Sequence, residues 1–297
     1  MSPSGRSEEG DRCFALILVH YNHPAHVDRL LAETRRWTRR PGVVVIVDNS
    51  DNLGISADER IQVLRPGRNL GYAGAMNLGV RHLQDAAERY DLLLLATQDM
   101  SLQPDGVAAL LETMEATPAA GMVAPLLCCS DSPDVIHSAG GKLSRRAHGR
   151  HIAQGAAAAR HEGRGPYQVT WADGACLLVR SQAFEAVGGF DESFFLYVED
   201  VDFATRLADA GWETWLTPAA VGYQQPGYFP TYLKYRNWVY FTGKPSTTYG
   251  PWCWPFHIGL DLARLVLRGT EFRFRDALRG VADGRASIMG PPEPTTS

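Results

Sequence analysis

The chain has 297 residues, enough to bury a large core as one large domain or two small ones. Its net charge of −4 at pH 7 gives no support for a nucleic-acid-binding role, which normally shows a basic balance. Five cysteines without a CxxC spacing argue against a disulfide framework or a zinc site and favour a reducing cytoplasm. No apolar run approaches the roughly 18 residues of a membrane span.

The first half of the chain alternates strand and helix patterns. One helix pattern follows the first apolar run and extends through Trp37. A second helix pattern begins in the glycine-rich stretch 68–79 and continues to about Leu83. This alternation predicts a parallel sheet with right-handed crossovers. Apolar runs typical of buried strands occupy residues 14–20, 43–47, 61–64 and 92–95.

Polar residues follow three of these predicted strands at the point where each strand ends. They are the pairs Tyr21-Asn22, Asp48-Asn49 and Gln98-Asp99. In parallel sheets ligands bind beyond the carboxyl ends of the strands. We therefore expect a binding site along this edge of the sheet.

The second half has a less regular pattern. Residues 131–165 lack a helical period and predict hairpins with a mobile loop. Residues 169–179 predict one strand interrupted at Asp173-Gly174, where glycine allows a close backbone approach. The other predicted strands are 122–127, 212–216 and a short piece from Pro218 to Tyr223, and the predicted helices are 106–116, a short one from Ser181, 231–242 and a last region 256–282.

Three carboxylates, Glu199, Asp200 and Asp202, begin a short amphipathic helix pattern that ends at Gly211. Asp200 would lie at or near the N-cap, where backbone N–H groups and the positive helix end keep a carboxylate ionised. An ionised carboxylate suits a general base. The alternative is a purely structural cap, with an i,i+4 pair between Asp202 and Arg206.

Seven motifs occur in a characteristic order and spacing. They are Val19-His20-Tyr21-Asn22, Val47-Asp48-Asn49-Ser50, the segment Asn69 to Asn77, Gln98-Asp99, Asp173-Gly174-Ala175-Cys176, Gly188-Gly189-Phe190-Asp191-Glu192 and Glu199-Asp200-Val201-Asp202. With these motifs the chain resembles family 2 glycosyltransferases of the GT-A fold, nearest the bacterial rhamnosyltransferase-like branch. The resemblance covers roughly residues 15–241.

The resemblance implies an α/β architecture, a Rossmann-like, mostly parallel sheet flanked by helices. A small antiparallel part would lie on the acceptor side, and helices would follow at the C-terminus. The GT-A domain would span 13–228, with a nucleotide-binding half of about 13–127 and a catalytic half of about 128–228. A helical extension would cover 229–286. The two ends of the chain, 1–12 and 287–297, are expected to be disordered.

The resemblance also implies roles for individual residues. Asp200 matches the catalytic base, with Glu199 in a supporting position. The residues expected at the nucleotide are Tyr21, Asn22, Asp48, Asn69, Gly71, Gly74, Asn77 and Gln98. Those expected at the acceptor or donor sugar are Trp171, which could instead fill the core, Asp173, Gly174 and Arg236.

A divalent metal would bridge the donor diphosphate in such an enzyme, through hard oxygen ligands. Asp99 matches the last residue of the family's Asp-x-Asp motif, but Thr97 occupies its first position. Gln224 stands where the family commonly has a histidine ligand. We therefore expect a weakly bound Mg²⁺ or Mn²⁺, with Asp99 as the clear ligand and Gln224 as a weak candidate.

The implied activity is inverting transfer from a nucleoside-diphosphate sugar, dTDP- or UDP-linked, to a hydroxyl of a glycan, lipid-linked or natural-product acceptor. The enzyme would be cytoplasmic, and the C-terminal helices either pack on the catalytic domain or contact anionic lipid at the inner membrane face. Two alternatives stay open. One is a non-catalytic nucleotide-sugar-binding protein, and the other is a nucleotidyltransferase, against which the absence of glycines after residues 14–20 counts.

Overall fold

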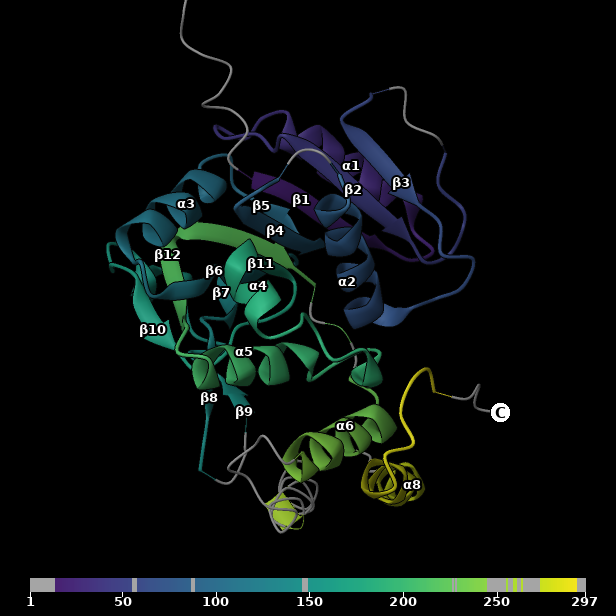
Figure 1. The fold of residues 1–297 in the computed structure, drawn as a ribbon. Helices are drawn as coiled ribbons and strands as arrows, with labels where there is room; N and C mark the ends of the chain where they lie inside the picture. Colours follow the sequence, from purple (N-terminus) through teal and green to yellow (C-terminus); the bar gives the residue numbers. More distant parts are fainter. Residues whose placement is uncertain are drawn as a thin grey trace, which may run out of the picture.

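The computed structural model describes residues 14–54, 58–86, 89–145, 149–225, 227, 229–244 and 273–292, with isolated positions 255, 259, 260 and 263. Their centre is a ten-stranded mixed sheet with helices on both faces (Figure 1). The longest path through the sheet has the order β10-β12-β6-β11-β4-β1-β2-β3. The predicted α/β architecture, a mostly parallel sheet flanked by helices, is confirmed.

The nucleotide-side half of the sheet is fully parallel, as predicted. It consists of β1 (Phe14–His20), β2 (Val43–Asp48), β3 (Ile61–Leu64) and β4 (Leu92–Thr97). Because β1 pairs with both β2 and β4, His20, Asp48 and Thr97 end at one edge of the sheet. The expected convergence of the polar strand ends therefore follows from this register.

The other half of the sheet is mixed. It contains β6 (Ala120–Cys129), β10 (Tyr167–Val169), β11 (Cys176–Arg180) and β12 (Glu213–Gln224). The short strands β5 (Ser101–Leu102) and β7 (Ser132–Ser138) pair with β12 and β6, and β8 (Gly141–Leu143) with β9 (Gly149–His151) forms a separate antiparallel hairpin.

Two strand predictions are corrected here. The pattern over 169–179 is not one interrupted strand, because β10 lies at the sheet edge on β12 whereas β11 lies inside, between β4 and β6. Residues 170–175 cross from one position to the other beside Asp200. Conversely, the two predicted pieces 212–216 and 218–223 form the single strand β12, which pairs with β6 through an irregularity between Thr217 and Val221.

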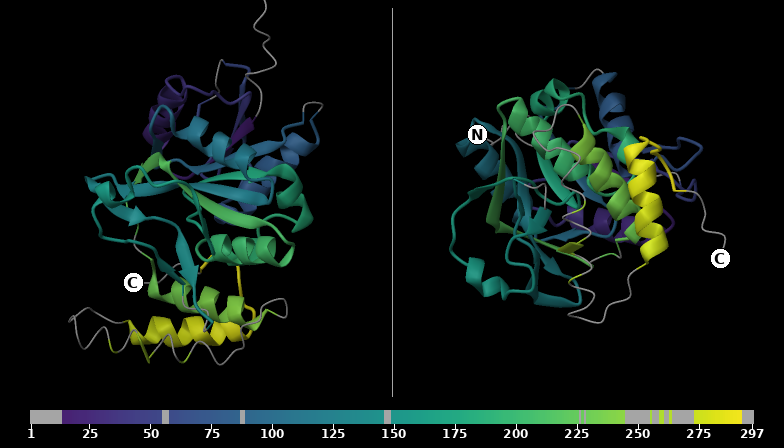
Figure 2. Two further views of the ribbon diagram at one scale, coloured as in Figure 1. Left: turned by 90° about the vertical axis from the view of Figure 1, so that its left-hand side faces the viewer. Right: turned by 90° about the horizontal axis from the view of Figure 1, so that it is seen from below.

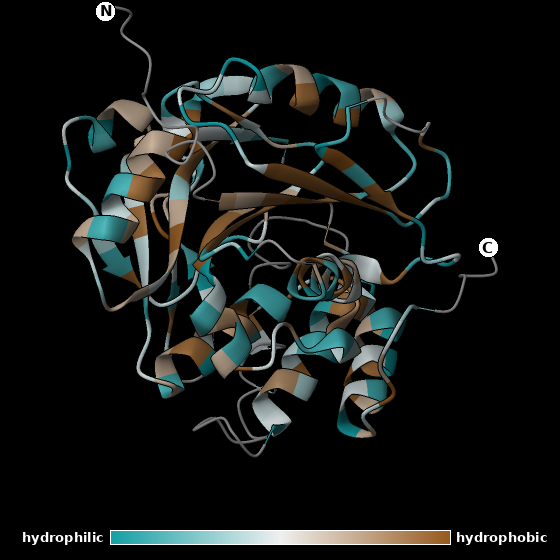
Figure 3. Cartoon of the chain, turned by 45° about the horizontal axis from the view of Figure 1, so that its top comes forward, coloured by the Kyte–Doolittle hydropathy of each residue, from teal (hydrophilic) through white to brown (hydrophobic). Residues whose placement is uncertain are grey.

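The strict alternation of side chains along β1 supplies two separate cores. Ala15 and Ile17 face α2 (Gly71–Gln84), α4 (Ser181–Ala186) and α5 (Glu199–Asp209), whereas Leu16 and Leu18 face α1 (Pro24–Thr34) and α3 (Gly106–Ala116). Figure 3 accordingly shows largely hydrophobic strands between helices of mixed character. The sheet is thus a rigid platform buried on both faces.

Two further helices, α6 (Thr231–Gly243) and α8 (Phe274–Arg285), pack side by side at one end of the molecule (Figure 2). Their contact buries Tyr235 and Val239 against Ala277 and Val281. The α6 prediction is confirmed, whereas most of the predicted helical region 256–282 before α8 lies outside the described residues. No helix within the described ranges is long and apolar enough to cross a bilayer.

The chain after α8 corrects the expected disordered tail over part of its length. The Gly290 N–H donates to Ser193 O at 3.0 Å, and Gly290 O accepts from Arg236 at 2.7 Å. Gly290 is therefore tied both to α6 and to the segment that precedes α5.

Candidate active site

Tyr21 lies on the rim of the sheet edge with its side chain available to a ligand. The Gln98 amide holds its backbone from both sides, accepting from Tyr21 N at 3.1 Å and donating to Tyr21 O at 2.7 Å. Tyr21 is 48% exposed, although large aromatic side chains tend to be buried. Asn22, with φ of 63°, continues this rim. The ring of Tyr21 is thus held open at the place where a nucleotide base was predicted.

Asp48 does not face the cleft, and the prediction that it binds the base is corrected. Its carboxylate is buried and accepts hydrogen bonds from the backbone N–H groups of residues 50, 52 and 53 and from the Ser50 hydroxyl. Burial alone would raise the pKa of Asp48, but these bonds outweigh it and lower the pKa. The carboxylate shapes the loop after β2 and has no free lone pair for a base.

The glycine-rich start of α2 also has a different role from the one predicted. Gly71 has φ of +72°, and a Cβ there would lie 2.1 Å from Phe195 O. Its own N–H donates to Asn69 Oδ1 at 2.8 Å, and Tyr72 N donates to Phe195 O at 2.7 Å. Gly71 therefore allows α2 to approach the loop before α5, and this N–H is not free for a phosphate. Gly74 lies buried in the helix behind it.

Asn77 is likewise part of the scaffold. Its amide exchanges two hydrogen bonds with the backbone of Phe190, each 2.9 Å long, and also donates to Glu192. These contacts fasten α2 to the turn that precedes α5. They leave no group of Asn77 for the nucleotide, which corrects that prediction.

The loop 195–198, immediately before the acidic helix α5, is conformationally strained. Phe195, Tyr197 and Val198 all have positive φ angles, between 64° and 73°. Such values are uncommon outside glycine and are a genuine outlier for a β-branched residue such as Val198. Strain of this kind persists only where surrounding contacts impose it, and it clusters at functional sites.

Asn237 and Arg236 of α6 impose this loop conformation. The buried Asn237 amide donates to Leu196 O and Tyr197 O, both at 2.8 Å. The Arg236 guanidinium, 1% exposed, donates to Phe194 O, Gly290 O and Asn237 Oδ1. The predicted diphosphate or acceptor contact of Arg236 is therefore corrected, because its donors are bound to backbone and scaffold groups below the cleft.

Asp200 occupies the second residue of α5, and Val198 rather than Asp200 is the N-cap. Its carboxylate remains partly exposed, accepting from Val201 N at 2.8 Å and from Gly174 N at 3.1 Å. Burial and the charge of Asp173 outweigh these two bonds and raise the pKa of Asp200 to about 7. The expectation of a fully ionised carboxylate is thus corrected: near neutral pH Asp200 exchanges its proton readily, as a general base does.

Glu199 lies beside Asp200 as the first residue of α5. It is 4% exposed, and its Oε2 atom has no hydrogen-bond partner. Burial and the neighbouring Asp200 raise the pKa of Glu199 well above its usual value. Both causes favour the protonated, neutral form of Glu199.

Gly174 and Asp173, which were expected at the acceptor or donor sugar, lie next to Asp200. Gly174 O accepts from Tyr72 Oη at 2.6 Å while Gly174 N donates to the Asp200 carboxylate. Trp171, in contrast, is 6% exposed and belongs to the core, with its ring against Gly141 and the His151 imidazole. Its proposed stacking on a sugar is therefore corrected.

His151 is a site residue that the sequence analysis missed. Its Nδ1 atom lies 3.0 Å from Ser138 Oγ and 3.2 Å from Asp173 Oδ2. His137, which showed no ligand spacing in the sequence, lies 5.3 Å from the His151 ring. The signal was hidden because β9 comes from a segment without periodicity. The composition of residues 137–151, rich in His and Arg, was the only indication.

The predicted metal ligands do come together. Gln224 Nε2 at the end of β12 lies 3.3 and 3.4 Å from the two Asp99 oxygens and 3.5 Å from Thr97 Oγ1. Among the residues that the structure describes, no group of three His, Cys, Asp or Glu side chains could hold a metal ion. One carboxylate with an amide and a hydroxyl is a set of hard oxygen donors that fits a weakly held Mg²⁺ or Mn²⁺.

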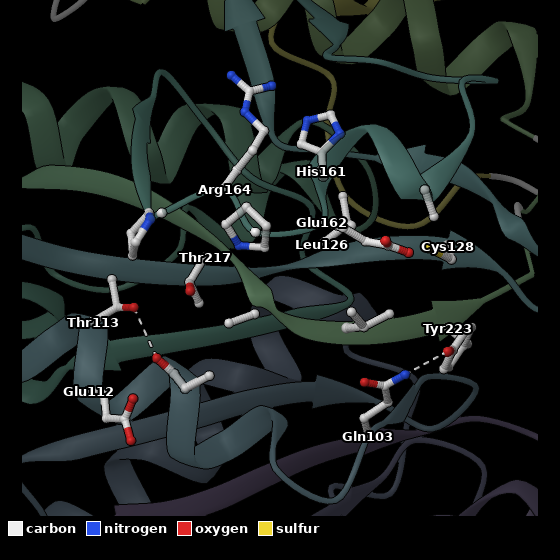
Figure 4. Close-up of a pocket in the computed structure, with 18 of the residues that line it drawn as sticks. Gln103, Glu112, Thr113, Leu126, Cys128, His161, Glu162, Arg164, Thr217 and Tyr223 are labelled. Carbon is white, nitrogen blue, oxygen red and sulfur yellow. Dashed lines mark hydrogen bonds between the residues drawn. The ribbon is translucent and has the colours of Figure 1, made fainter.

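A separate cavity of about 620 Å³ lies between α3, β12 and the segment 161–166. Figure 4 shows Glu112 and Thr113 on one side of it and His161 and Arg164 on the other. None of the predicted site residues lines this cavity. The candidate site is therefore not this cavity but the group of residues around Asp200, together with Asp99 and Gln224.

Comparisons with known proteins agree with this geometry. Residues 71–228 match the family described as glycosyl transferase family 21. The chain is also 34% identical over 226 residues to the N-acetylglucosaminyl-diphospho-decaprenol L-rhamnosyltransferase of Mycobacterium tuberculosis, covering 69% of this chain and 73% of that protein.

Two solved structures share the fold. The first, GalNAc-T7 with UDP, GalNAc and Mn²⁺, has a TM-score of 0.61 at 14% identity and covers 80% of this chain, which spans about half (49%) of that protein. The mannosyltransferase PcManGT from Pyrobaculum calidifontis, with GDP-Man and Mn²⁺, has a TM-score of 0.52 at 16% identity, covering 92% of this chain and 79% of that one. Identities this low support the fold alone.

Together with the matches above, the fold and its group of acids at Asp173, Glu199 and Asp200 thus define a GT-A glycosyltransferase that uses a nucleotide-sugar donor. The chain belongs to the glycosyl transferase family whose model spans residues 71–228. The matching model is numbered family 21, whereas the motifs resembled family 2. The similarity to a rhamnosyltransferase confirms the expected relation to the rhamnosyltransferase-like branch.

Proposed function

We propose that this enzyme transfers a sugar with inversion of the anomeric configuration and that Asp200 is the general base. An acceptor hydroxyl oxygen attacks the anomeric carbon while the bond to the diphosphate breaks on the opposite face. The hydroxyl proton passes to the Asp200 carboxylate, and the nucleoside diphosphate leaves as an anion. One displacement by an activated hydroxyl inverts the anomeric centre.

The observation that carries this proposal is the environment of Asp200. Of the three neighbouring acids Glu199, Asp200 and Asp173, Glu199 is almost completely buried, and Asp173 is paired with His151. Asp200 is partly exposed, and its pKa of about 7 lies near the operating pH, where proton transfer by a positioned carboxylate is most effective. It is the member of this group best suited to accept a proton from a substrate.

Asp99 and Gln224 are the residues that would hold a divalent metal at the donor diphosphate. A half-turn of the Gln224 amide would direct its oxygen, rather than its NH₂ group, to an ion at Asp99. A bound Mg²⁺ or Mn²⁺ would neutralise charge on the leaving diphosphate. Because one carboxylate and neutral oxygens make a weak site, the donor phosphates would supply further ligands.

The donor is proposed to be a dTDP- or UDP-linked sugar, with the base on Tyr21. The open tyrosine ring, fixed through its backbone by Gln98, supports stacking on a pyrimidine. A direct measurement is isothermal titration with dTDP, UDP and GDP in the presence of Mn²⁺. Tyr21→Ala should weaken the preferred nucleotide by roughly 1–3 kcal/mol, as stacking on an aromatic side chain does.

The acceptor is proposed to be a hydroxyl-bearing glycan, lipid-linked or natural-product molecule, reached by an enzyme that works in the cytoplasm. Helix α8 supports a peripheral contact with the inner membrane face, because Phe274 and Leu278 are more than half exposed beside Arg275 and Arg279. Sedimentation with anionic vesicles tests this contact. A Phe274→Ser, Leu278→Ser variant should lose vesicle binding and keep transfer to a soluble acceptor analogue.

The experiment that tests the whole proposal is a turnover assay over a panel of nucleotide sugars and hydroxyl acceptors. NMR of the glycoside product should show the anomeric configuration opposite to that of the donor. A retained configuration would contradict the single displacement. Nucleotide-sugar binding without turnover on any acceptor would favour the non-catalytic alternative.

A further inference from the structure

The hairpin β8–β9 brings a histidine to Asp173 from outside the GT-A motifs. Gly141 at its base lies so close to the Trp171 ring that a Cβ there would be 1.9 Å from a ring carbon. The His151 ring also packs edge-on against Trp171, with the ring centroids 5.0 Å apart. This packing fixes the imidazole against the carboxylate of Asp173.

The contact between His151 and Asp173 is an ion pair within a largely buried cluster. Nδ1 lies 3.2 Å from Asp173 Oδ2, and the two side chains are 25% and 17% exposed. At this distance the imidazole stabilises the Asp173 carboxylate and lowers the pKa of Asp173. Asp173 is in turn one residue from Gly174, whose N–H binds Asp200.

We infer that His151 is a positioning residue for the catalytic base, because it holds Asp173 as an anion beside Asp200. The inference rests on the proposed function and adds a residue to it. Asp173 favours the proton on Asp200 and so strengthens the base, while the imidazolium limits that effect. The pair sets the pH at which Asp200 changes from acid to base.

The surrounding groups leave the pair as the main adjustable charge near Asp200. His151 contacts Asp173, Ser138, His137 and Trp171. The charges of Asp173 and His151 act on Asp200, and the charge of Asp200 acts in turn on Glu199 and Tyr72. Burial lowers the pKa of His137 and raises the pKa values of Glu199 and Tyr72, which favours the neutral form of each of these groups.

Each partner of the pair acts on Asp200 with the opposite sign. Burial is the largest cause of the raised pKa of Asp200; the Asp173 charge raises it further and the His151 charge lowers it. Although burial opposes both charges, the pKa of His151 is raised and that of Asp173 is lowered, each by the close contact with the other, through hydrogen bonding first and charge second. Removing the two partners separately should therefore move the titration of Asp200 in opposite directions.

The test is the pH profile of kcat/KM for the full chain with three variants. Because activity requires ionised Asp200, Asp173→Asn should move the acid limb down by about one pH unit, the scale of one close like charge. His151→Gln should move the same limb up. His137→Gln is the matched control, since it removes a neighbouring neutral imidazole, and its limb should stay at the wild-type position.

Opposite shifts of the two variants, with an unmoved control, support the inference. Shifts in the same direction, or lower rates without any shift, overturn it and leave His151 a packing residue. Restoration of the wild-type limb by Asp173→Glu would add support, because the negative charge returns.

A second measurement needs no turnover and so separates this inference from the proposed function. The imidazole NMR signal that disappears in His151→Gln should titrate above the ordinary histidine range in the wild type. In Asp173→Asn the same signal should titrate at least one unit lower, the scale of a lost opposite charge. An unchanged His151 titration overturns the ion pair whether or not the enzyme transfers a sugar.

Discussion

Asp48 and Asp200 are two acids at comparable places in the chain that the structure uses in opposite ways. Asp48 is the last residue of β2 and Asp200 is the second residue of α5, and each accepts backbone hydrogen bonds. Asp48 receives four donors from its own loop, which lower its pKa. Asp200 receives two and has Asp173 nearby, and its pKa rises to about 7.

Hydrogen-bond donors lower the pKa of a carboxyl and burial raises it. The difference shows that the balance of these two effects decides whether an acid is a structural anion or can act as a base. Four donors satisfy the Asp48 oxygens completely and make the carboxylate a permanent part of the loop 48–53. Two donors leave Asp200 in a site where burial still opposes the charge. A motif match at either position could not separate these outcomes, because the surrounding structure sets the hydrogen bonds and the burial of each carboxylate.

Of the predicted changes, Asp200→Asn should have the largest effect, and that effect should be a loss of catalysis. The amide keeps the shape and can still accept from Gly174, but it cannot take a proton. We expect kcat to fall by roughly 10²–10⁴-fold, the usual contribution of a positioned base. Donor affinity, measured by calorimetry, should stay within a few-fold. A variant that keeps more than about a tenth of wild-type turnover would exclude Asp200 as the base.

Asp48→Asn should instead lower the stability of the fold. One amide cannot accept all four hydrogen bonds, and a hydrogen bond to a charged group contributes about 1.5–3 kcal/mol. Urea unfolding at pH 7 should therefore show a loss of roughly that size. Since the pKa of Asp48 is lowered, its contribution is present above pH 4 and disappears in stronger acid.

The control for this stability measurement is Asp51→Asn in the same loop. Asp51 is an exposed partner of Arg65, and surface ion pairs contribute only about 0–1 kcal/mol. Equal losses in the Asp48 and Asp51 variants would mean that the buried carboxylate has no special structural role.

Gln224→His, at a proposed metal ligand, should have the smallest effect of these changes, and that effect should be on the Mn²⁺ requirement. An imidazole is a better ligand than a neutral amide oxygen for Mn²⁺. At saturating donor we expect the Mn²⁺ concentration for half-maximal activity to fall several-fold, with little change in kcat. An unchanged midpoint would place Gln224 away from the ion, and full activity in EDTA would remove the metal from the mechanism.

The elements that could be predicted from the sequence are those with a local signal. The parallel strands β1 to β4 follow from continuous apolar runs, and Asp200 follows from an acid at the start of an amphipathic helix. The GT-A fold and the glycosyltransferase class were also predicted correctly from the motifs.

The remaining features depend on contacts between distant segments. Asn237 binds carbonyls about 40 residues away, and His151 reaches Asp173 only because Gly141 lets the hairpin lie on Trp171. Likewise the role of Gly71 is set by the Phe195 carbonyl, which no pattern within 68–79 indicates. Sequence periodicity reports which face is buried and contains no signal for such pairings.

The pH dependence of kcat/KM for the wild-type enzyme tests the central claim most directly, because it reports the base in the free enzyme. The rate should rise about tenfold per pH unit in acid and level off with a midpoint at about 7, the pKa of Asp200. Asp200→Glu, which keeps a carboxyl group, should retain an acid limb at a shifted midpoint. A profile without an inflection between about pH 5.5 and 8.5 would contradict the assignment of Asp200 as the general base.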